Sequence, residues 1–204
     1  MDNNTTVKIP ALKPIYPAKD HQSFRELLRY VAKEYSTDDA FIAKTGKDEK
    51  GASVYTHITY KDFETDVNAF GAGMIKQGMM SKRIAILGIN SYQWYMTYFA
   101  TMRGLGISVP LDKGLPYEEV EYSLIKSKAD CLIFGKEQLN IVKRLQESGK
   151  TSISLYIAMD AVDGFTSLND VMEDGRRAIR SGDDSFASWR FCHSITLSDQ
   201  QRRL

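Results

Sequence analysis

The sequence predicts an α/β fold with a doubly wound, mostly parallel sheet and helices on both of its faces. Between residues 83 and 182, short apolar runs alternate four times with amphipathic stretches, in the order strand, helix, strand, helix. The first run, RIAILGI, lacks polar alternation, which is typical of a strand buried on both faces. Short, regular alternation of this kind indicates right-handed parallel crossovers.

The segment before this unit predicts an arm, a helix and a hairpin. Residues 1–20 are polar and carry three prolines, so we expect an extended N-terminal arm. SFRELLRYVAKEY has apolar residues at helical spacing, and Ser23 with Glu26 matches a capping box. AFIAK and ASVYTHIT flank the polar loop TGKDEKG, which predicts a hairpin over residues 40–59.

The next predicted helix spans residues 59–79, with Thr59 or the following residue as its cap. Gly71 and Gly73 lie inside it and favour close packing against a neighbouring element over the approach of a ligand. Its apolar stripe consists of Phe63, Val67, Phe70 and Met74.

The alternating unit divides into four strands and four helices. The strands are predicted at 83–89, 107–111, 130–135 and 153–159, and the helices at 90–104, 115–128, 136–148 and 166–182. Asn90 or Ser91 can cap the first of these helices, and Asn90 is interpreted as a cap rather than a ligand contact.

Composition narrows the function classes. The chain has 204 residues and a net charge of +1, which indicates one large domain or a piece of a larger protein and does not suggest nucleic-acid binding. MDNNTTVKIPALKPIYP has no apolar leader region, and no run approaches the roughly 18 apolar residues of a membrane span. We therefore expect a cytoplasmic protein.

Ligands of such sheets bind outside the carboxyl ends of the strands, which points to GINSYQW, PLDKGLP and GKEQ. No dinucleotide fingerprint or P-loop is present, which argues against a Rossmann dehydrogenase. Asp112 is predicted to be a turn residue, with a metal or ribose contact as the alternative. Trp94 is predicted to pack in the core, with a stacking platform as the alternative.

No metal site is predicted from the cysteines and histidines. His21, His57 and His193 are scattered, Cys192 lies near the end of the chain, and Cys131 in DCLIFG is expected to be a buried structural thiol.

The ordered series of motifs resembles adenylate-forming enzymes, the AMP-dependent synthetases and ligases. THITYKDFETDVNAFGAGMIKQGM is similar to the helix before their first core strand. KRIAILGIN, then W with GISVPL, then LPYEEVEYSLIKSKADCLIF follow in the same order as in that family. LKPIYPAKDHQSFRELL is similar to bacterial long-chain fatty acid CoA ligases. The resemblance covers roughly residues 12–185.

The resemblance implies an acyl-CoA synthetase that uses ATP, Mg²⁺ and coenzyme A on a fatty acid and passes through an acyl-adenylate. The family's phosphate loop, adenylate-binding segment, ribose-binding Asp and lid lysine have no counterpart in this chain. No catalytic, cofactor-binding or metal residue is therefore assigned. The matched positions are interpreted as scaffold: Gly88, Asn90, Trp94, Gly106, Pro110 and Leu111.

The resemblance divides the chain into an arm (1–20), a partial AMP-binding domain (21–185) and an aberrant tail (186–204) that we expect to be disordered. A lost reading frame near Trp189 is one explanation of the tail, with a natural short protein or a deliberate truncation as alternatives. The expected function is the N-terminal fragment of an acyl-CoA synthetase, inactive alone. The alternative is a stand-alone, non-catalytic α/β module that binds an acyl or CoA ligand or a partner ligase.

Overall fold

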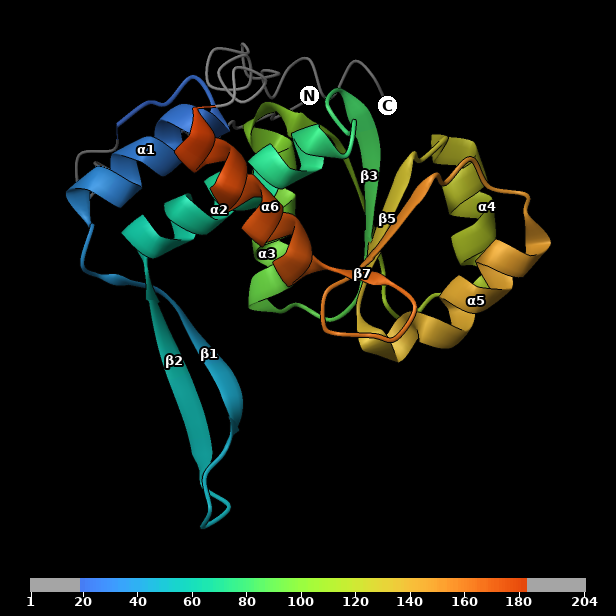
Figure 1. The fold of residues 1–204 in the computed structure, drawn as a ribbon, viewed down its shortest axis with the longest axis horizontal. Coiled ribbons are helices and arrows are strands. Elements are labelled where there is room, and N and C mark those ends of the chain that lie inside the picture. Colours follow the sequence, from blue (N-terminus) through green and yellow to red (C-terminus); the bar gives the residue numbers. More distant parts are fainter. Residues whose placement is uncertain (1–18, 183–204) are drawn as a thin grey trace, which may run out of the picture.

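A five-stranded parallel sheet lies at the centre of the structure, a computed structural model that describes residues 19–182 (Figure 1). The helices are α1 (Phe24–Glu34), α2 (Tyr60–Lys76), α3 (Tyr92–Ala100), α4 (Tyr117–Ser127), α5 (Leu139–Ser148) and α6 (Leu168–Ser181). The strands are β1 (Asp39–Lys47), β2 (Ser53–Thr59), β3 (Lys82–Leu87), β4 (Gly106–Leu111), β5 (Cys131–Phe134), β6 (Leu155–Ala158) and β7 (Thr166–Ser167).

The strand order is β4-β3-β5-β6-β7, and every neighbouring pair is parallel. Helices α2, α3 and α6 lie on one face of this sheet, and α4 and α5 lie on the other (Figure 1). The predicted doubly wound α/β class is therefore confirmed.

Successive residues of the central strands enter two separate cores. Ile84 and Ile86 of β3 belong to the core under α2, α3 and α6, whereas Ala85 and Leu87 belong to the core under α4 and α5. In β5, Cys131 takes part in the first core and is fully buried, as predicted. This two-sided burial explains why the runs of β3 and β5 lack polar alternation.

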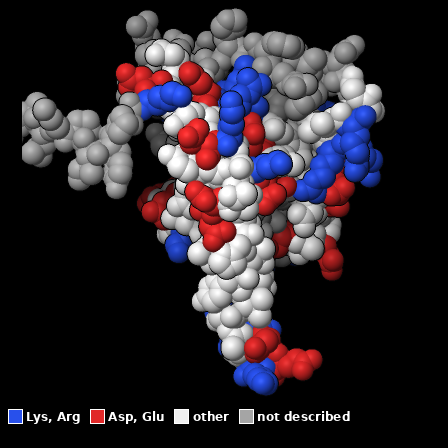
Figure 2. All heavy atoms as spheres, turned by 90° about the vertical axis from the view of Figure 1, so that its left-hand side faces the viewer, with Lys and Arg blue, Asp and Glu red and all other residues white. Residues whose placement is uncertain are grey.

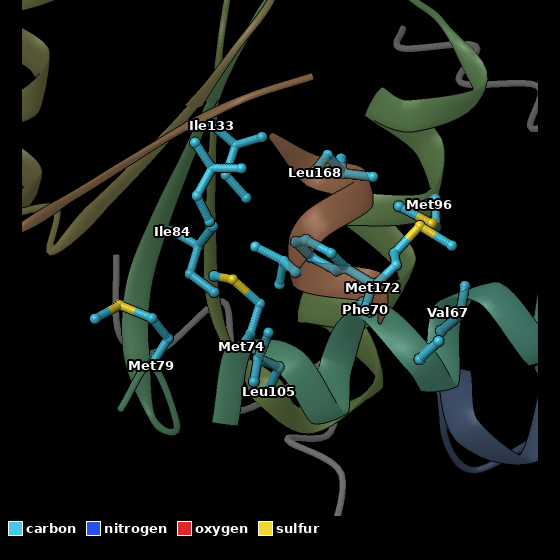
Figure 3. Close-up of a cluster of buried hydrophobic side chains, with 14 of the residues drawn as sticks. Val67, Phe70, Met74, Met79, Ile84, Met96, Leu105, Ile133, Leu168 and Met172 are labelled. Carbon is cyan, nitrogen blue, oxygen red and sulfur yellow. The ribbon is translucent and has the colours of Figure 1, made fainter. Parts of the chain in front are cut away.

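The predicted stripe of α2 fills the first core. Val67, Phe70 and Met74 are fully buried and belong to the same core as the sheet residues Ile84 and Ile133, with Met74 on the side of the cluster toward Ile84 (Figure 3). Full burial of one such side chain stabilises a fold by about 1.5–3 kcal/mol. Thr59 caps the helix with a complete capping box, because its hydroxyl and the Asp62 carboxylate each accept the other's backbone N–H.

Two glycines allow α2 and α6 to cross in backbone contact. A Cβ atom added to Gly73 would lie 2.0 Å from the carbonyl oxygen of Val171, and one added to Gly175 would lie 1.8 Å from that of Ala69. The close packing predicted for Gly73 is thereby confirmed, and α6 provides the neighbouring element.

Strands β1 and β2 form an antiparallel ribbon that projects from the body (Figure 1). The hairpin prediction is confirmed, but β1 extends to Lys47, past the predicted end of its strand. The Asp48 side chain accepts the backbone N–H groups of Lys50 and Ala52 at 2.9 and 2.8 Å, which closes a short turn and leaves the preceding residues free to pair.

Three local features differ from the predictions. The helix predicted at 90–104 ends at Ala100 and continues as a wide turn, Thr101–Leu105, in which Gly104 has a φ of 126°. A 3₁₀ turn, Lys136–Gln138, precedes α5. The two-residue strand β7 was not predicted, because two residues carry no periodic signal.

Within residues 19–182, no helix is long and apolar enough to cross a membrane. Most of the predicted arm (residues 1–18) and the whole predicted tail (residues 186–204) lie outside the described residues, as do Cys192 and His193.

Candidate functional site

The direction of winding reverses at β3. The chain passes from β3 to β4 on one side and then crosses back to β5 on the other side of β3. In open α/β sheets such a switch point is where ligands bind, outside the carboxyl ends of the strands. The stretches that follow β3, β4 and β5 are the three that the sequence indicates.

The switch-point crevice between β3 and β5 is closed by the protein itself. A Cβ atom on Gly88 would lie 3.1 Å from the backbone nitrogen of Gly135, so the two loops meet at a position where a side chain would press on the neighbouring backbone. The backbone N–H of Ile89 donates to Oε1 of Glu137 at 3.0 Å and joins the same loops. Gly88 therefore has a structural role, in agreement with its interpretation as a scaffold position.

An open cavity of about 470 Å³ lies beside this closure, between the ends of β3 and β4. Nε2 of Gln138 donates to the carbonyl oxygen of Lys113 at 3.1 Å and ties the stretch after β5 to the stretch after β4. The cavity is lined by Gly88, Ile89, Asn90, Trp94, Leu111, Asp112 and Lys113. The three predicted stretches do meet at one edge of the sheet.

Asp112 has the role predicted for it at this edge, whereas Asn90 does not. Oδ1 of Asp112 accepts the backbone N–H of Gly114 at 2.7 Å, which confirms the turn role. Asn90 does not cap α3. Ser91 does so instead, because its hydroxyl accepts the N–H of Trp94 at 3.2 Å. Asn90 therefore lies exposed at the rim of the cavity, where its amide is open to a ligand.

Trp94 combines the two roles considered for it. Its ring stacks on Tyr98 at 5.4 Å between centroids and 13° between planes, and it packs against the first core. It also lines the cavity, so the same indole provides part of the wall.

A second open cavity, of about 640 Å³, lies between the hairpin and the start of α3. Its lining carries Lys44 from β1 and Asp160 from the loop after β6, so one positive and one negative side chain border it. Ile89, Asn90 and Tyr95 complete its α3 side. No local sequence pattern indicates this cavity, because its hairpin wall and its α3 wall are about 30 to 50 residues apart and share no motif.

A partly buried polar network joins α3 to α2 and α6. The Tyr92 hydroxyl donates to Oδ2 of Asp66 at 2.8 Å, and the Arg176 guanidinium donates to Oδ1 of Asp66, also at 2.8 Å. Burial, and next the nearby Asp66 carboxylate, raise the pKa of Tyr92 well above its ordinary value. Tyr92 lines the second cavity, so this network positions one of its walls.

The arrangement is suited to binding. Neither cavity is lined by histidine or cysteine, and within residues 19–182 no cluster of His, Cys, Asp and Glu could hold a metal ion. The ammonium group of Lys113 and the amide of Asn90 can contact an anionic or polar ligand. Nothing in this lining forms a nucleophile with an activating base.

Comparison with known proteins places these observations in context. The family model described as AMP-binding enzyme matches residues 28–184. A search of curated proteins found no match.

Solved structures share the fold at low identity. A long-chain-fatty-acid-CoA ligase from Archaeoglobus fulgidus has 19% identity and a TM-score of 0.65, over 81% of this chain and 33% of that chain. A proposed long-chain-fatty-acid CoA ligase from Rhodopseudomonas palustris has 18% identity and a TM-score of 0.61, over 73% of this chain and 36% of that chain. The anthranilate CoA ligase AuaEII, solved with anthranoyl-AMP, has 17% identity and a TM-score of 0.59, over 74% of this chain and 27% of that chain. The chain thus spans about a third of these proteins.

Proposed function

Because the chain belongs to the family of AMP-binding enzymes, we propose that it provides the N-terminal α/β unit of a fatty acyl-CoA synthetase. The observation that carries this proposal is the match of the family model to residues 28–184, which covers most of the described chain. Two of the similar solved structures are named as long-chain-fatty-acid CoA ligases, and this supports a fatty acid as the substrate.

The proposed reaction has two steps. A carboxylate oxygen of the fatty acid attacks the α-phosphorus of ATP, and the bond to the β-phosphate breaks with release of pyrophosphate. The thiol of coenzyme A then attacks the carbonyl carbon of the acyl-adenylate, and AMP leaves. A reaction that consumes ATP and coenzyme A favours the cytoplasm as its location. The family enzyme's task is to position the reactants and stabilise the charge that develops.

The described part of the chain fits the role of a scaffold in this reaction. The Glu137–Ile89 and Gln138–Lys113 hydrogen bonds join the loops at its sheet edge, and the cavity beside them can contact a ligand. The described residues include no cluster suited to Mg²⁺, so we assign no step that involves the metal to them. We expect residues 1–204 alone to be inactive in adenylation.

Pyrophosphate release tests this expectation. Purified protein is incubated with ATP, Mg²⁺, coenzyme A and palmitate, and pyrophosphate is measured with a coupled assay. We expect no release above that of a heat-denatured sample. Multiple turnovers that depend on palmitate, and that persist after repeated chromatography, would show that the chain is an enzyme by itself.

The alternative is a non-catalytic binding module. It is favoured by the volumes of the two cavities, which fall within the roughly 300–1,000 Å³ of small-molecule sites. Calorimetric titration with palmitate and with coenzyme A, in the absence of ATP, separates the two proposals. Micromolar binding of either ligand without pyrophosphate release would support the module.

A further inference from the structure

Helix α4 presents a mixed charged and apolar stripe to solvent, on the side of the molecule opposite α1 (Figure 1). The inner face of α4 is fixed in the core under α4 and α5 by Val120 and Leu124, which are fully buried. Exposed residues at helical spacing form the outer face. We call them the α4 stripe: Glu118, Glu119, Tyr122, Ile125 and Lys126.

The centre of the α4 stripe is apolar. At 66%, Tyr122 is the most exposed large hydrophobic side chain of residues 19–182, and Ile125, one turn further along α4, is 42% exposed. The Tyr122 side chain makes no ring contact or hydrogen bond with any residue of the described chain. Tyrosine is enriched at protein interfaces, and covering this pair of side chains would remove apolar surface from water.

The two ends of the stripe carry opposite charges. Glu118 already has a partner, because its Oε1 lies 3.4 Å from Nη2 of Arg144 in α5. The side chains of Glu119 and Lys126, in contrast, make no ion pair or hydrogen bond with any residue of 19–182. These two residues are seven positions apart, so they lie on the same side of α4, about 10 Å from each other along the helix axis. The stripe therefore has an acidic end, an apolar centre and a basic end.

A stripe with this order is complementary to itself when a second copy runs antiparallel to it. A two-fold axis that crosses α4 at right angles midway between Glu119 and Lys126, next to Tyr122, places Glu119 of one copy opposite Lys126 of the other. The same axis brings the Tyr122 rings of the two copies together. Two-fold dimers are the commonest oligomers, and their interfaces use one self-complementary patch twice. We propose that α4 is a self-association surface, through which two copies of the chain pair antiparallel along the α4 stripe.

The size of the stripe determines how strong this pairing is. Helix α4 has 11 residues and is about 16 Å long, so one pair of helices buries less surface than the roughly 1,200–2,000 Å² of stable complexes. Ion pairs between exposed side chains contribute little each, and salt screens them. The dimer is therefore weak and reversible, and it weakens further as the salt concentration rises.

Sedimentation equilibrium of the 204-residue protein tests the proposal, in a concentration series that extends to about 1 mM because an interface of this size is weak. Glu119→Lys and Lys126→Glu each place like charges opposite one another at both ends of the pair. The matched controls Glu34→Lys and Lys33→Glu make the same changes of charge at exposed positions of α1. Figure 2 shows the side of the molecule that carries α1, where acidic and basic side chains are intermixed. Circular dichroism checks that all four variants are folded.

We expect each α4 variant to weaken self-association at least about tenfold, because two attractive contacts become repulsive, and each control to change it less than about twofold. An equimolar mixture of Glu119→Lys and Lys126→Glu should associate as strongly as the wild type, because each replaced charge then meets an opposite one. A monomer at every concentration, or α4 variants as strong as the wild type, would overturn the proposal. Association that both α4 variants lose and their mixture does not regain would mean that α4 contacts a surface other than a second α4, and would also overturn it. Because the readout is association, failure here is distinguishable from failure of the proposed adenylation.

Discussion

Replacement of Gly175 by alanine tests the helix crossing on which the first core depends. The new Cβ atom would lie 1.8 Å from the carbonyl oxygen of Ala69, about 1.2 Å closer than the roughly 3.0 Å at which Cβ atoms normally begin to make contacts. A backbone carbonyl inside a helix cannot rotate away, so α6 must move from α2. Overpacking of this kind costs about 1–3 kcal/mol. The higher helix propensity of alanine offsets this by stabilising the helix by about 1 kcal/mol relative to glycine.

The overpacking cost minus the gain in helix propensity leaves a net loss of up to about 2 kcal/mol in the free energy of unfolding. Because the clash is with a backbone atom, we expect a value near this upper limit. With a urea slope of about 2 kcal/mol/M, the midpoint of unfolding falls by about 1 M. Far-UV circular dichroism during urea titration measures it. Asn169→Ala, at an exposed position of the same helix, is the control and should change stability by less than about 0.5 kcal/mol. A Gly175→Ala protein as stable as the wild type would refute the close crossing.

Three further predictions concern polar groups and the buried thiol. Tyr92→Phe removes the hydrogen bond to Asp66 and should destabilise the fold by about 1.5 kcal/mol, whereas the exposed Tyr122→Phe should have no effect on thermal unfolding. Burial raises the pKa of Tyr92, so its contribution is complete below about pH 10 and decreases above it; stability curves of wild type and Tyr92→Phe should converge at alkaline pH. Thr59→Ala removes the cap of α2 and should lower the urea-derived stability by about 1 kcal/mol, and no change would exclude a capping contribution. Burial also raises the pKa of Cys131, so in a Cys192→Ser background its thiol should react with a disulfide reagent only on unfolding; rapid labelling of the native protein would contradict this.

The strand–helix alternation could be predicted because each element carries its own period. The stripe of α2 and the continuous apolar runs of β3 and β5 depend only on which faces are buried. The wide turn at Thr101–Leu105 and the short strand β7 could not be predicted, because neighbouring elements impose them and the local sequence does not. Gly73 could be predicted to pack closely, but its partner Val171 is about 100 residues away and only the fold identifies it.

The position of the candidate site followed from topology, whereas its details did not. The rule for carboxyl ends of parallel strands indicated all three stretches that meet at the edge. The side chains that join them, Glu137 and Gln138, bond to backbone atoms 48 and 25 residues away, and no local pattern encodes such contacts. The sequence left the cap open between Asn90 and Ser91 because Asn and Ser are equally favoured there, and only the backbone geometry selects Ser91 over the preferred interpretation of Asn90 as a cap.

The packing of α2 against α6 also has a consequence for the order of events during protein synthesis. The contact between Asp66 and Arg176 joins residues 110 positions apart, so the apolar stripe of α2 leaves the ribosome long before the helix that covers it. At about 5–20 residues per second, this delay lasts about 6–20 s. During this interval Phe70 and its neighbours remain without their final covering layer. A nascent chain of this protein should therefore be a substrate for chaperones that bind exposed apolar helices.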